Sequence, residues 1–382
     1  MTEKGKKVMR IMINGRVLSE RMGGPARYIK NIIYELSRLD NKNHYYILIK
    51  KEGYNLDFAL PENFKIVRLS TNNRFVFDYI LLPWFTWKRR IDASIFPKNT
   101  YSPLARGGKI PVYHDIIYFE KELDFREFKF FDQLHHRLMI PVAAKFSAYD
   151  LTVSDFTAGR MKELLGINGK KIRIIKEGVE SSFRRITEKG KLQSIIKKHG
   201  LVRPFFFYSG SLSPRKNIAS AIKAYGRLCS DIPHRFYITG PDSWNNSEKE
   251  VFRLIDDLGL SDKIKVLGLV SDDELVALYN LADCYLYPSL YEGFGLPILE
   301  AQACGCPVIT SNVASCPEVA GDGALYVDPM DEKSIADAML KLVGDKKLRN
   351  RLVQNGLKNI QRFSWSGAAK GILELLEECG SK

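Results

Sequence analysis

Short apolar runs alternate with amphipathic stretches along the whole chain. An apolar run followed by a helical periodicity is typical of parallel α/β sheets, in which a crossover helix follows each strand. We expect strands at residues 8–13, 45–49, 93–96, 110–113, 151–153 and 172–175, and again at 205–208, 235–238, 264–267, 284–287, 308–309 and 325–327. The pattern predicts two doubly wound α/β domains, and 382 residues suffice for two separate cores.

The alternation of apolar runs and amphipathic stretches stops at residues 180–204, a segment rich in Lys and Arg. We therefore place a linker at 186–203, between an N-terminal domain at 1–185 and a C-terminal domain at 204–363. Both domains are predicted to be Rossmann-like, and such sheets bind their ligands outside the carboxyl ends of the strands.

A glycine-containing turn joins the expected strand at 284–287 to a helix. Gly293 and Gly295 let the backbone approach a ligand closely, and a helix N-terminus offers unpaired N–H groups and partial positive charge. Two carboxylates, Glu292 and Glu300, flank this turn. A phosphate-binding turn between two groups that accept hydrogen bonds from hydroxyls suits a nucleotide-activated sugar better than a bare phosphate.

The segment from Glu292 to Glu300 resembles the E-x7-E motif of retaining glycosyltransferases with the GT-B fold, grouped as family GT4. The resemblance covers essentially the whole chain and implies two Rossmann-like domains facing a central cleft. It also implies that the last helix, 364–382, crosses back onto the N-terminal, acceptor-binding domain. The other matching segments follow in the family's order: 23–28, 114–115, 153–157, 210–217, 303–309 and 317–322.

The resemblance also implies roles for the residues of the turn. Glu300 is expected to bind the ribose, the alternative being a helix carboxylate that pairs with a nearby cation. Glu292 is expected to bind hydroxyls of the transferred sugar, the alternative being a surface loop acid. The backbone N–H groups directed at sugar and phosphate are expected from Gly293, Phe294, Gly295 and Leu296.

The loop at 210–217 resembles the family's diphosphate-binding loop, in which fixed positive charge stabilises the leaving group. Lys216 is the expected cation. The family commonly has an Arg directly after the first glycine of this loop, where this chain has Ser211, so Arg215 is the alternative source of a second cation. The alternative interpretation is that this basic loop is a solvated turn that binds no ligand.

The first half contributes fewer candidates. Gly23 and Gly24 are expected to form a loop that admits the diphosphate or the acceptor, unless it is an ordinary connection. The resemblance places His114 near the transferred sugar, whereas a lone His at a strand end is otherwise structural. The predicted catalytic residues are Glu292, Lys216 and His114. The predicted donor-binding residues are Gly23, Gly24, Ser211, Arg215, Lys216, Glu292, Gly293, Phe294, Gly295, Leu296 and Glu300.

The chain contains no D-x-D sequence, so a metal–diphosphate clamp has no evident ligands. No carboxylate nucleophile is apparent either, and the resemblance implies retention of configuration, with the departing phosphate oxygen taking the acceptor's proton. We expect no metal and no cofactor besides the nucleotide-sugar donor. The six cysteines lack a paired CxxC framework and are expected to be reduced, in a cytoplasmic protein.

The net charge of +14 comes entirely from the first half, because residues 1–200 contain 38 Lys and Arg against 21 Asp and Glu. Such an excess favours an anionic partner, that is, nucleic acid, an anionic membrane or a phosphorylated acceptor, unless the face is merely basic. Residues 75–90 combine two Trp with Lys88, Arg89 and Arg90. This segment is either an interfacial helix, which would place the protein on the inner face of the cell membrane, or a core helix.

Three other classes of protein share parts of this pattern. A dinucleotide-dependent enzyme would need a third glycine where Ile298 stands. A nucleic-acid-binding protein would contain a sequence-recognition module, which is not recognisable here, so no nucleic-acid partner is predicted. An epimerase-type nucleotide-sugar enzyme of the same fold is the remaining alternative.

The Pro-Arg-Lys-Asn sequence at 214–217 looks most like mannosyl- and rhamnosyltransferases of bacterial surface-polysaccharide assembly. The prediction is a retaining hexosyltransferase that uses GDP-mannose or a similar donor and a saccharide or lipid-linked acceptor.

Overall fold

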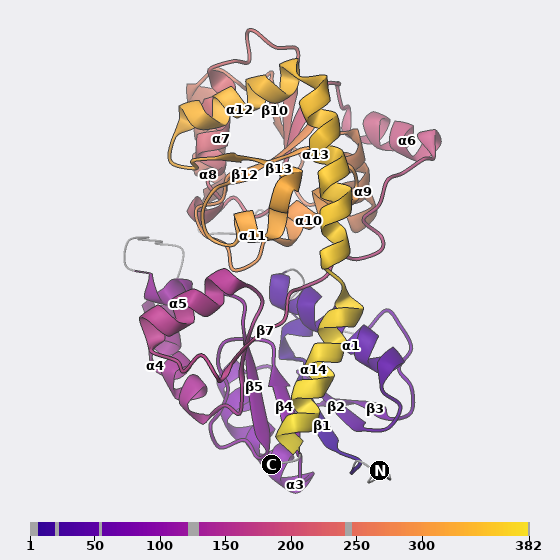
Figure 1. The fold of residues 1–382 in the computed structure, drawn as a ribbon, viewed down its shortest axis with the longest axis vertical. Coiled ribbons are helices and arrows are strands. Elements are labelled where there is room, and N and C mark those ends of the chain that lie inside the picture. The colour runs from indigo at the N-terminus through magenta and orange to yellow at the C-terminus, as the bar shows by residue number, and fades with distance from the viewer. Residues whose placement is uncertain (1–6, 20–22, 53–55, 121–129, 241–246, 381–382) are drawn as a thin grey trace. The chain divides into compact units, whose positions relative to one another are not determined.

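The computed structural model describes residues 7–19, 23–52, 56–120, 130–240 and 247–380. These residues form two compact units, each with its own parallel sheet (Figure 1). The first unit comprises the described residues up to Gly178 together with those from Ser364 onward, and the second comprises those from Val179 to Phe363. The last helix therefore belongs to the first unit, as the family resemblance implied.

The first unit contains a seven-stranded parallel sheet with the order β3-β2-β1-β4-β5-β6-β7. The order reverses between β1 and β4, which makes the sheet doubly wound. Six of the strands were expected from the sequence, whereas β3 was missed because only Phe64 is buried in this edge strand. The strands are β1 (Arg10–Asn14), β2 (His44–Ile49), β3 (Phe64–Arg68), β4 (Ala93–Phe96), β5 (Gly108–Tyr113), β6 (Asp150–Thr152) and β7 (Ile172–Ile174).

Helices flank this sheet, and the C-terminal helix packs closely on it. A Cβ atom at Gly108, in β5, would lie only 2.6 Å from the Cβ of Cys379, so this strand needs a glycine where the C-terminal helix passes. The helices are η1 (Arg16–Ser19), α1 (Gly24–Leu39), α2 (Arg74–Val76), η2 (Phe77–Leu81), α3 (Leu82–Lys88), η3 (Ile117–Phe119), α4 (Phe130–Phe146), α5 (Asp155–Leu165) and α14 (Trp365–Gly380).

The segment 75–90 is neither wholly core nor wholly surface. It forms α2, the π-helical turn η2 and α3, and its inner side chains Phe77, Leu82 and Phe85 belong to the core under the sheet. Its outer side chains, Trp84 and Trp87 among them, are exposed. The core interpretation therefore holds for the inner side only, and the interfacial interpretation stays a prediction.

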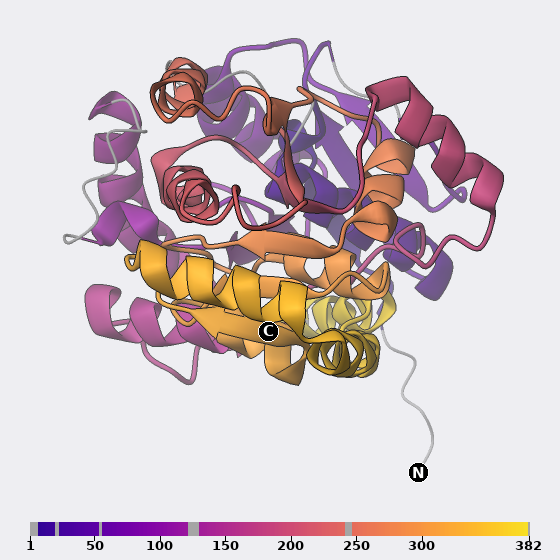
Figure 2. The ribbon, with the colours of Figure 1, turned by 90° about the horizontal axis from the view of Figure 1, so that it is seen from above.

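The second unit contains a six-stranded parallel sheet with the order β10-β9-β8-β11-β12-β13, and all six strands were expected. The chain starts in the middle of the sheet at β8, builds outward to β10, and then returns to add β11 beside β8. Figure 2 shows helices on both faces of this sheet. The strands are β8 (Phe205–Ser209), β9 (Arg235–Thr239), β10 (Ile264–Val266), β11 (Cys284–Tyr287), β12 (Val308–Ser311) and β13 (Ala324–Val327).

The residues expected to form the linker contain a helix, α6, which ends at the left-handed cap Gly200. None of its residues is fully buried, which explains why the apolar rhythm fades there. The helices of this unit are α6 (Lys189–His199), η4 (Pro214–Lys216), α7 (Ile218–Gly226), α8 (Ser247–Asp257), α9 (Asp272–Leu281), α10 (Leu296–Ala303), α11 (Cys316–Ala320), η5 (Gly321–Gly323), α12 (Glu332–Gly344), α13 (Lys346–Asn359) and η6 (Ile360–Arg362).

The loops that follow β8 and β9 approach each other closely at the carboxyl edge of this sheet. A Cβ atom at Gly240 would lie 1.9 Å from the carbonyl oxygen of Gly210, so any other residue would push the two loops apart. The amide of Gly210 in turn donates to the carbonyl of Thr239. These contacts fix the start of the basic loop that was predicted to bind diphosphate.

Candidate active site

The strand order of the second unit reverses between β8 and β11, where the chain leaves for opposite edges of the sheet. Open α/β sheets bind ligands at such a switch point, outside the carboxyl ends of the strands. The two loops that start there are 210–217, after β8, and 288–295, after β11. They are the two segments that the sequence singled out, and they lie against each other, because the amide of Leu290 donates to the carbonyl of Arg215.

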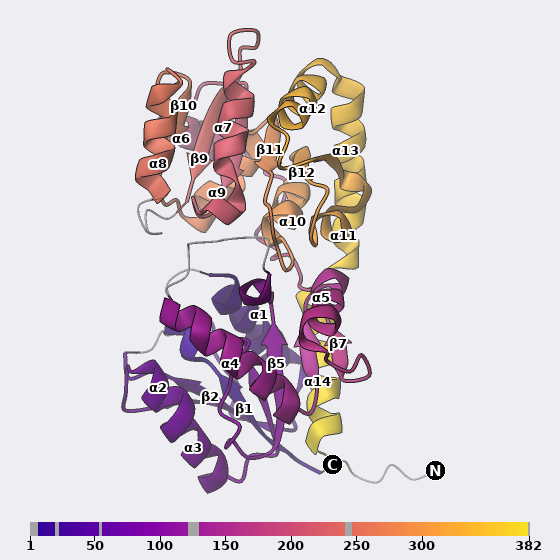
Figure 3. The same cartoon turned by 90° about the vertical axis from the view of Figure 1, so that its left-hand side faces the viewer.

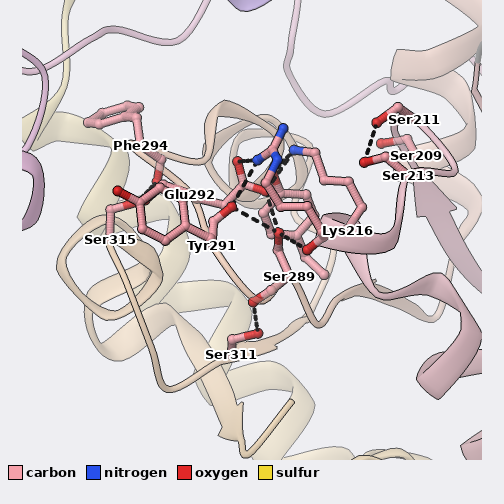
Figure 4. A network of polar contacts seen from close by, with 12 residues as sticks. Ser209, Ser211, Ser213, Lys216, Ser289, Tyr291, Glu292, Phe294, Ser311 and Ser315 are labelled. Carbon is pink, nitrogen blue, oxygen red and sulfur yellow. Dashed lines mark hydrogen bonds and ion pairs between the residues drawn. The ribbon is translucent and has the colours of Figure 1, made fainter. Parts of the chain in front are cut away.

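A three-residue ion cluster joins these loops (Figure 4). The Nζ of Lys216 donates to Oε1 of Glu292 at 2.7 Å, and Nη1 of Arg215 donates to Oε2 of the same carboxylate at 3.1 Å. Lys216 also donates to the hydroxyl of Tyr287 at 2.8 Å. Glu292 is 6% exposed, so the sequence alternative of a surface loop acid is wrong. With all three groups ionised, the cluster keeps one surplus positive charge.

The pKa values of the cluster follow from burial and from mutual attraction. Burial by itself would raise the pKa of Glu292, but the charges of Lys216 and Arg215 and the hydrogen bonds to the carboxylate lower that pKa to about 2. Burial lowers the pKa of Lys216, and the opposing effect of Glu292 offsets this only in part. Arg215 stays charged at every physiological pH. Glu292 is therefore firmly ionised and at least one fixed cation lies beside it.

Serine hydroxyls hold the Glu292 turn in shape. Ser289 donates to Oε1 of Glu292 at 2.5 Å, and Ser315 donates to the backbone carbonyls of Glu292 and Phe294 at 3.0 and 2.6 Å. Ser311 donates to the carbonyl of Ser289 at 2.6 Å. All three serines are buried. The sequence reasoning missed them because a buried serine has no signature before the fold brings it to its partner.

The turn ends at the helix that was expected to bind an anion. Gly295 has a φ of +111° and occupies the N-cap position of α10, so a residue with a side chain would be strained there. The helix begins at Leu296, and Pro297 is its second residue. Of the residues whose amides were assigned to sugar and phosphate, Gly295 and Leu296 lie at this N-terminus, and Gly293 and Phe294 lie in the preceding turn.

Glu300 lies one turn into α10 and is 3% exposed. Its Oε2 accepts a hydrogen bond from the hydroxyl of Tyr279 at 3.2 Å. The same hydroxyl lies 2.7 Å from Oγ of Ser209, at the end of β8, and that Oγ lies 3.1 Å from the hydroxyl of Tyr285. A buried chain of hydroxyls therefore orients the carboxylate that was predicted to bind ribose. Tyr279 and Tyr285 were not singled out from the sequence, since buried tyrosines in apolar runs read as core.

Two polar residues of the basic loop make contacts outside the ion cluster, and the donor-binding role of Ser211 stays a prediction. Ser211 donates to Ser213 at 3.3 Å and lies apart from the ion cluster (Figure 4). Asn217 occupies the N-cap position of α7 but makes no capping bond. Its side chain donates instead to the carbonyls of Pro288 and Pro329, at 3.0 and 2.7 Å. Asn217 thus ties the basic loop to the segments that follow β11 and β13.

The remaining predicted residues lie in the first unit. Gly23 is the N-cap residue of α1, and Gly24 is its first helical residue, so Gly24 belongs to the helix and not to a loop. His114 follows β5, with Nδ1 3.2 Å from Oε1 of Glu177 and Nε2 3.1 Å from the carbonyl of Pro97. The hydrogen-bonded structural role is thus present, and a role of His114 or of the two glycines toward a ligand stays a prediction.

The two doubly wound units and the site at the switch point of the second define the class: the protein has the GT-B fold of glycosyltransferases. Residues 193–359, nearly the whole second unit, match the profile of the family described as glycosyl transferases group 1. Among the described residues, no group of three His, Cys, Asp or Glu side chains is placed to hold a metal ion.

Known relatives agree with this placement. The chain is 31% identical over 218 residues to the O-antigen chain mannosyltransferase B of Escherichia coli, covering 56% of each chain. It is 33% identical over 238 residues to the O-antigen chain mannosyltransferase RfbU of Salmonella typhimurium, covering 62% of this chain and 61% of the relative. The chain thus spans little more than half the length of these curated relatives. A solved structure of Anabaena HepE in complex with UDP-glucose has the same fold, with a TM-score of 0.75 at 18% identity over 97% of this chain and all of the other.

Proposed function

We propose that this protein transfers a hexose, with mannose favoured, from a nucleoside diphosphate sugar to a hydroxyl of a saccharide or lipid-linked acceptor, in glycan biosynthesis. The observation that carries the proposal is the buried cluster of Lys216, Arg215 and Glu292 beside the N-terminus of α10. This arrangement offers cations and backbone amides to a diphosphate, and carboxylates to hydroxyls.

In the proposed reaction the sugar C1–O bond to the β-phosphate breaks while a C1–O bond to the acceptor forms on the same face. The departing phosphate oxygen takes the proton of the acceptor hydroxyl, so no carboxylate nucleophile is needed. Negative charge grows on the diphosphate as it leaves, and Lys216 and Arg215 are positioned in advance to stabilise it. Neither a metal nor another cofactor takes part in this proposal.

In this proposal the two carboxylates, Glu300 and Glu292, bind different parts of the donor. Glu300, held by Tyr279, accepts hydrogen bonds from the ribose hydroxyls. Glu292 binds hydroxyls of the transferred sugar while it keeps Lys216 in place. Orientation of this kind lowers the barrier without covalent participation of the protein.

Two further observations support the details of the proposal. The favoured donor, GDP-mannose, rests on the names of the mannosyltransferase relatives and on the sequence of the basic loop. A cytoplasmic location rests on the cysteines, which are all free in the described chain, five of them buried. Free thiols persist in a reducing compartment.

Calorimetric titration with GDP-, UDP- and dTDP-hexoses, without added metal and with a chelator, tests the proposal. One nucleotide series should bind, and GDP-mannose should be transferred to an acceptor with its configuration retained. Binding that requires a divalent cation would refute metal independence. An absence of binding by any nucleoside diphosphate sugar would refute the proposed function itself.

A further inference from the structure

The helical segment α2-η2-α3 presents a row of large apolar side chains to solvent. Phe77, Leu82 and Phe85 on its inner side belong to the core. The opposite side consists of side chains that are all more than half exposed: Phe75, Ile80, Trp84 and Trp87. A surface helix of a soluble domain normally has polar residues on its outer side. This segment therefore exposes apolar area that the fold does not use.

Helix α4 also exposes apolar side chains on its outer side. The sequence analysis did not detect this. His136, Ile140 and Ala143 face inward and are buried. On the outer side Phe131 is 80% exposed, and Phe130 and Leu138 are also mostly exposed. The apolar character all round this helix hides the difference between its sides when only the sequence is read.

The two helical segments lie side by side in the first unit (Figure 3). The ring of Phe75 lies 5.7 Å from that of His135 in α4, and Arg74 pairs with Asp132 at 3.6 Å. Phe77 and Ala143, one from each segment, belong to the same core cluster under the sheet. Since both segments pack on the same side of the sheet, their outer sides face the same way.

One surface therefore unites exposed apolar side chains from three parts of the chain. Leu104 extends it beyond Trp87, whose indole Nε1 donates to the carbonyl of Leu104 at 3.0 Å. We call this surface the apolar–basic face, and its apolar members are Phe75, Ile80, Trp84, Trp87, Leu104, Phe130, Phe131 and Leu138.

The segments that form this face carry many more cations than carboxylates. The Nζ of Lys88 lies 4.5 Å from the ring centre of Trp84, and the guanidinium of Arg106 lies 5.7 Å from that of Trp87. The segments 74–90, 101–109 and 130–146 contain two carboxylates, Asp78 and Asp132, and both are paired with arginines. The Lys and Arg residues of the same three segments are Arg74, Lys88, Arg89, Arg90, Arg106, Lys109, Arg137 and Lys145.

We propose that the apolar–basic face docks on an anionic lipid bilayer. Exposed Trp and Phe rings suit the depth of lipid headgroups, and the flanking cations suit lipid phosphates. A second copy of the chain would bring like charges together, which opposes association through this face. Docking of this kind is interfacial, since no helix within the described ranges is long and apolar enough to cross a bilayer. The inference does not depend on the proposed transfer reaction.

Co-sedimentation of the full chain with vesicles tests this inference. The protein should bind vesicles containing about 30% phosphatidylglycerol at low salt and lose most of this binding at about 0.5 M NaCl, because salt screens the attraction. Lys88→Glu and Lys145→Glu should each weaken binding by about fivefold or more. The matched control is Lys347→Glu, which reverses an exposed cation in the second unit.

The apolar part of the inference needs its own variants. Phe131→Ser combined with Leu138→Ser should weaken binding, whereas Leu340→Ser, which changes an exposed leucine of the second unit, should not. Trp84→Phe combined with Trp87→Phe keeps the apolar area, so binding should persist. The blue shift of tryptophan emission on adding vesicles should disappear in that variant, because these two indoles report the docked state.

Three results would overturn the proposal. They are no binding to anionic vesicles at low salt, equal binding to phosphatidylcholine vesicles at high salt, and equal loss in the control variants. A concentration-dependent dimer that the Phe131→Ser/Leu138→Ser variant abolishes would assign the face to a second copy instead. Nucleoside diphosphate binding, measured in parallel, should be unchanged in every variant. Its absence from all of them, including the wild type, would count against the proposed function and not against docking.

Discussion

The Nζ of Lys216 lies 2.7 Å from Oε1 of Glu292, which joins the loop after β8 to the loop after β11 at the switch point of the sheet. In the sequence these residues were assigned to different parts of the donor. The structure shows that each also fixes the position of the other. Substitution of either is therefore expected to affect the whole site.

Lys216→Ala should lower kcat by roughly a hundredfold to a thousandfold, because the leaving diphosphate loses a prearranged positive charge. Arg215→Ala should cost less, since Arg215 also donates to the carbonyl of Tyr291 and is partly committed to holding the turn. Steady-state kinetics of both variants give the comparison, with Lys333→Ala, an exposed ion-pair variant, as the control. A larger loss in Arg215→Ala would show that the main cation has been misassigned.

Glu300→Gln should weaken nucleoside diphosphate binding by about tenfold or more, because the ribose loses hydrogen bonds to a charged acceptor. Calorimetry with the nucleoside diphosphate and with inorganic pyrophosphate separates the two parts of the ligand. Pyrophosphate affinity should not change. Equal losses for both ligands would remove Glu300 from the ribose.

Tyr279→Phe should weaken nucleoside diphosphate binding by about threefold, because Glu300 loses the hydroxyl that orients its Oε2. The effect should vanish when Glu300 is already Gln, which a double-mutant cycle measures. Additive losses in the double variant would indicate that Tyr279 acts on the fold and not through Glu300.

Acid should destabilise the protein partly through Glu292. Its pKa in the folded state, about 2, lies below its ordinary value of 4.5, so its stabilising contribution is complete above pH 4.5 and is lost as the pH falls toward 2. The shift corresponds to about 3 kcal/mol. Urea unfolding of Glu292→Gln at pH 7, 5 and 3.5 should show a flatter pH dependence than the wild type. Parallel curves for the two proteins would contradict this contribution.

Gly240→Ala should destabilise the protein by about 3 kcal/mol, because its Cβ would clash with the carbonyl of Gly210. Diphosphate affinity should fall as well, since the displaced loop carries Lys216. Gly344→Ala, at a helical glycine with open space around it, is the control and should be neutral or slightly stabilising. Unchanged thermal stability of Gly240→Ala would show that the two loops move apart without cost.

Much of the fold followed from periodicity, because buried parallel strands read as continuous apolar runs. Edge strand β3 was not predicted, since only Phe64 of its five residues is buried. Helix α6, inside the expected linker, was not predicted for the same reason, because no residue in it is fully buried. Elements with little buried area leave little pattern in a sequence.

The candidate site was predictable where it depends on local chemistry and unpredictable where it depends on distant partners. The spacing of the glycines and carboxylates around Gly295 was enough to predict a ligand-binding turn. The bonds from Tyr279 to Glu300 and from Asn217 to Pro329 join residues 21 and 112 positions apart, and nothing local marks them. One part of the apolar–basic face was marked locally, by the Trp residues and cations of 75–90. The contribution of α4 appears only when the fold sets α4 beside α2.

The most direct test of this account is a crystal structure of the protein with a nucleoside diphosphate bound. The account predicts phosphate oxygens within about 3 Å of Nζ of Lys216 and of the amides that open α10, with a ribose hydroxyl on the carboxylate of Glu300. A nucleotide bound at another edge of the sheet, with the Lys216–Glu292 pair untouched, would contradict it.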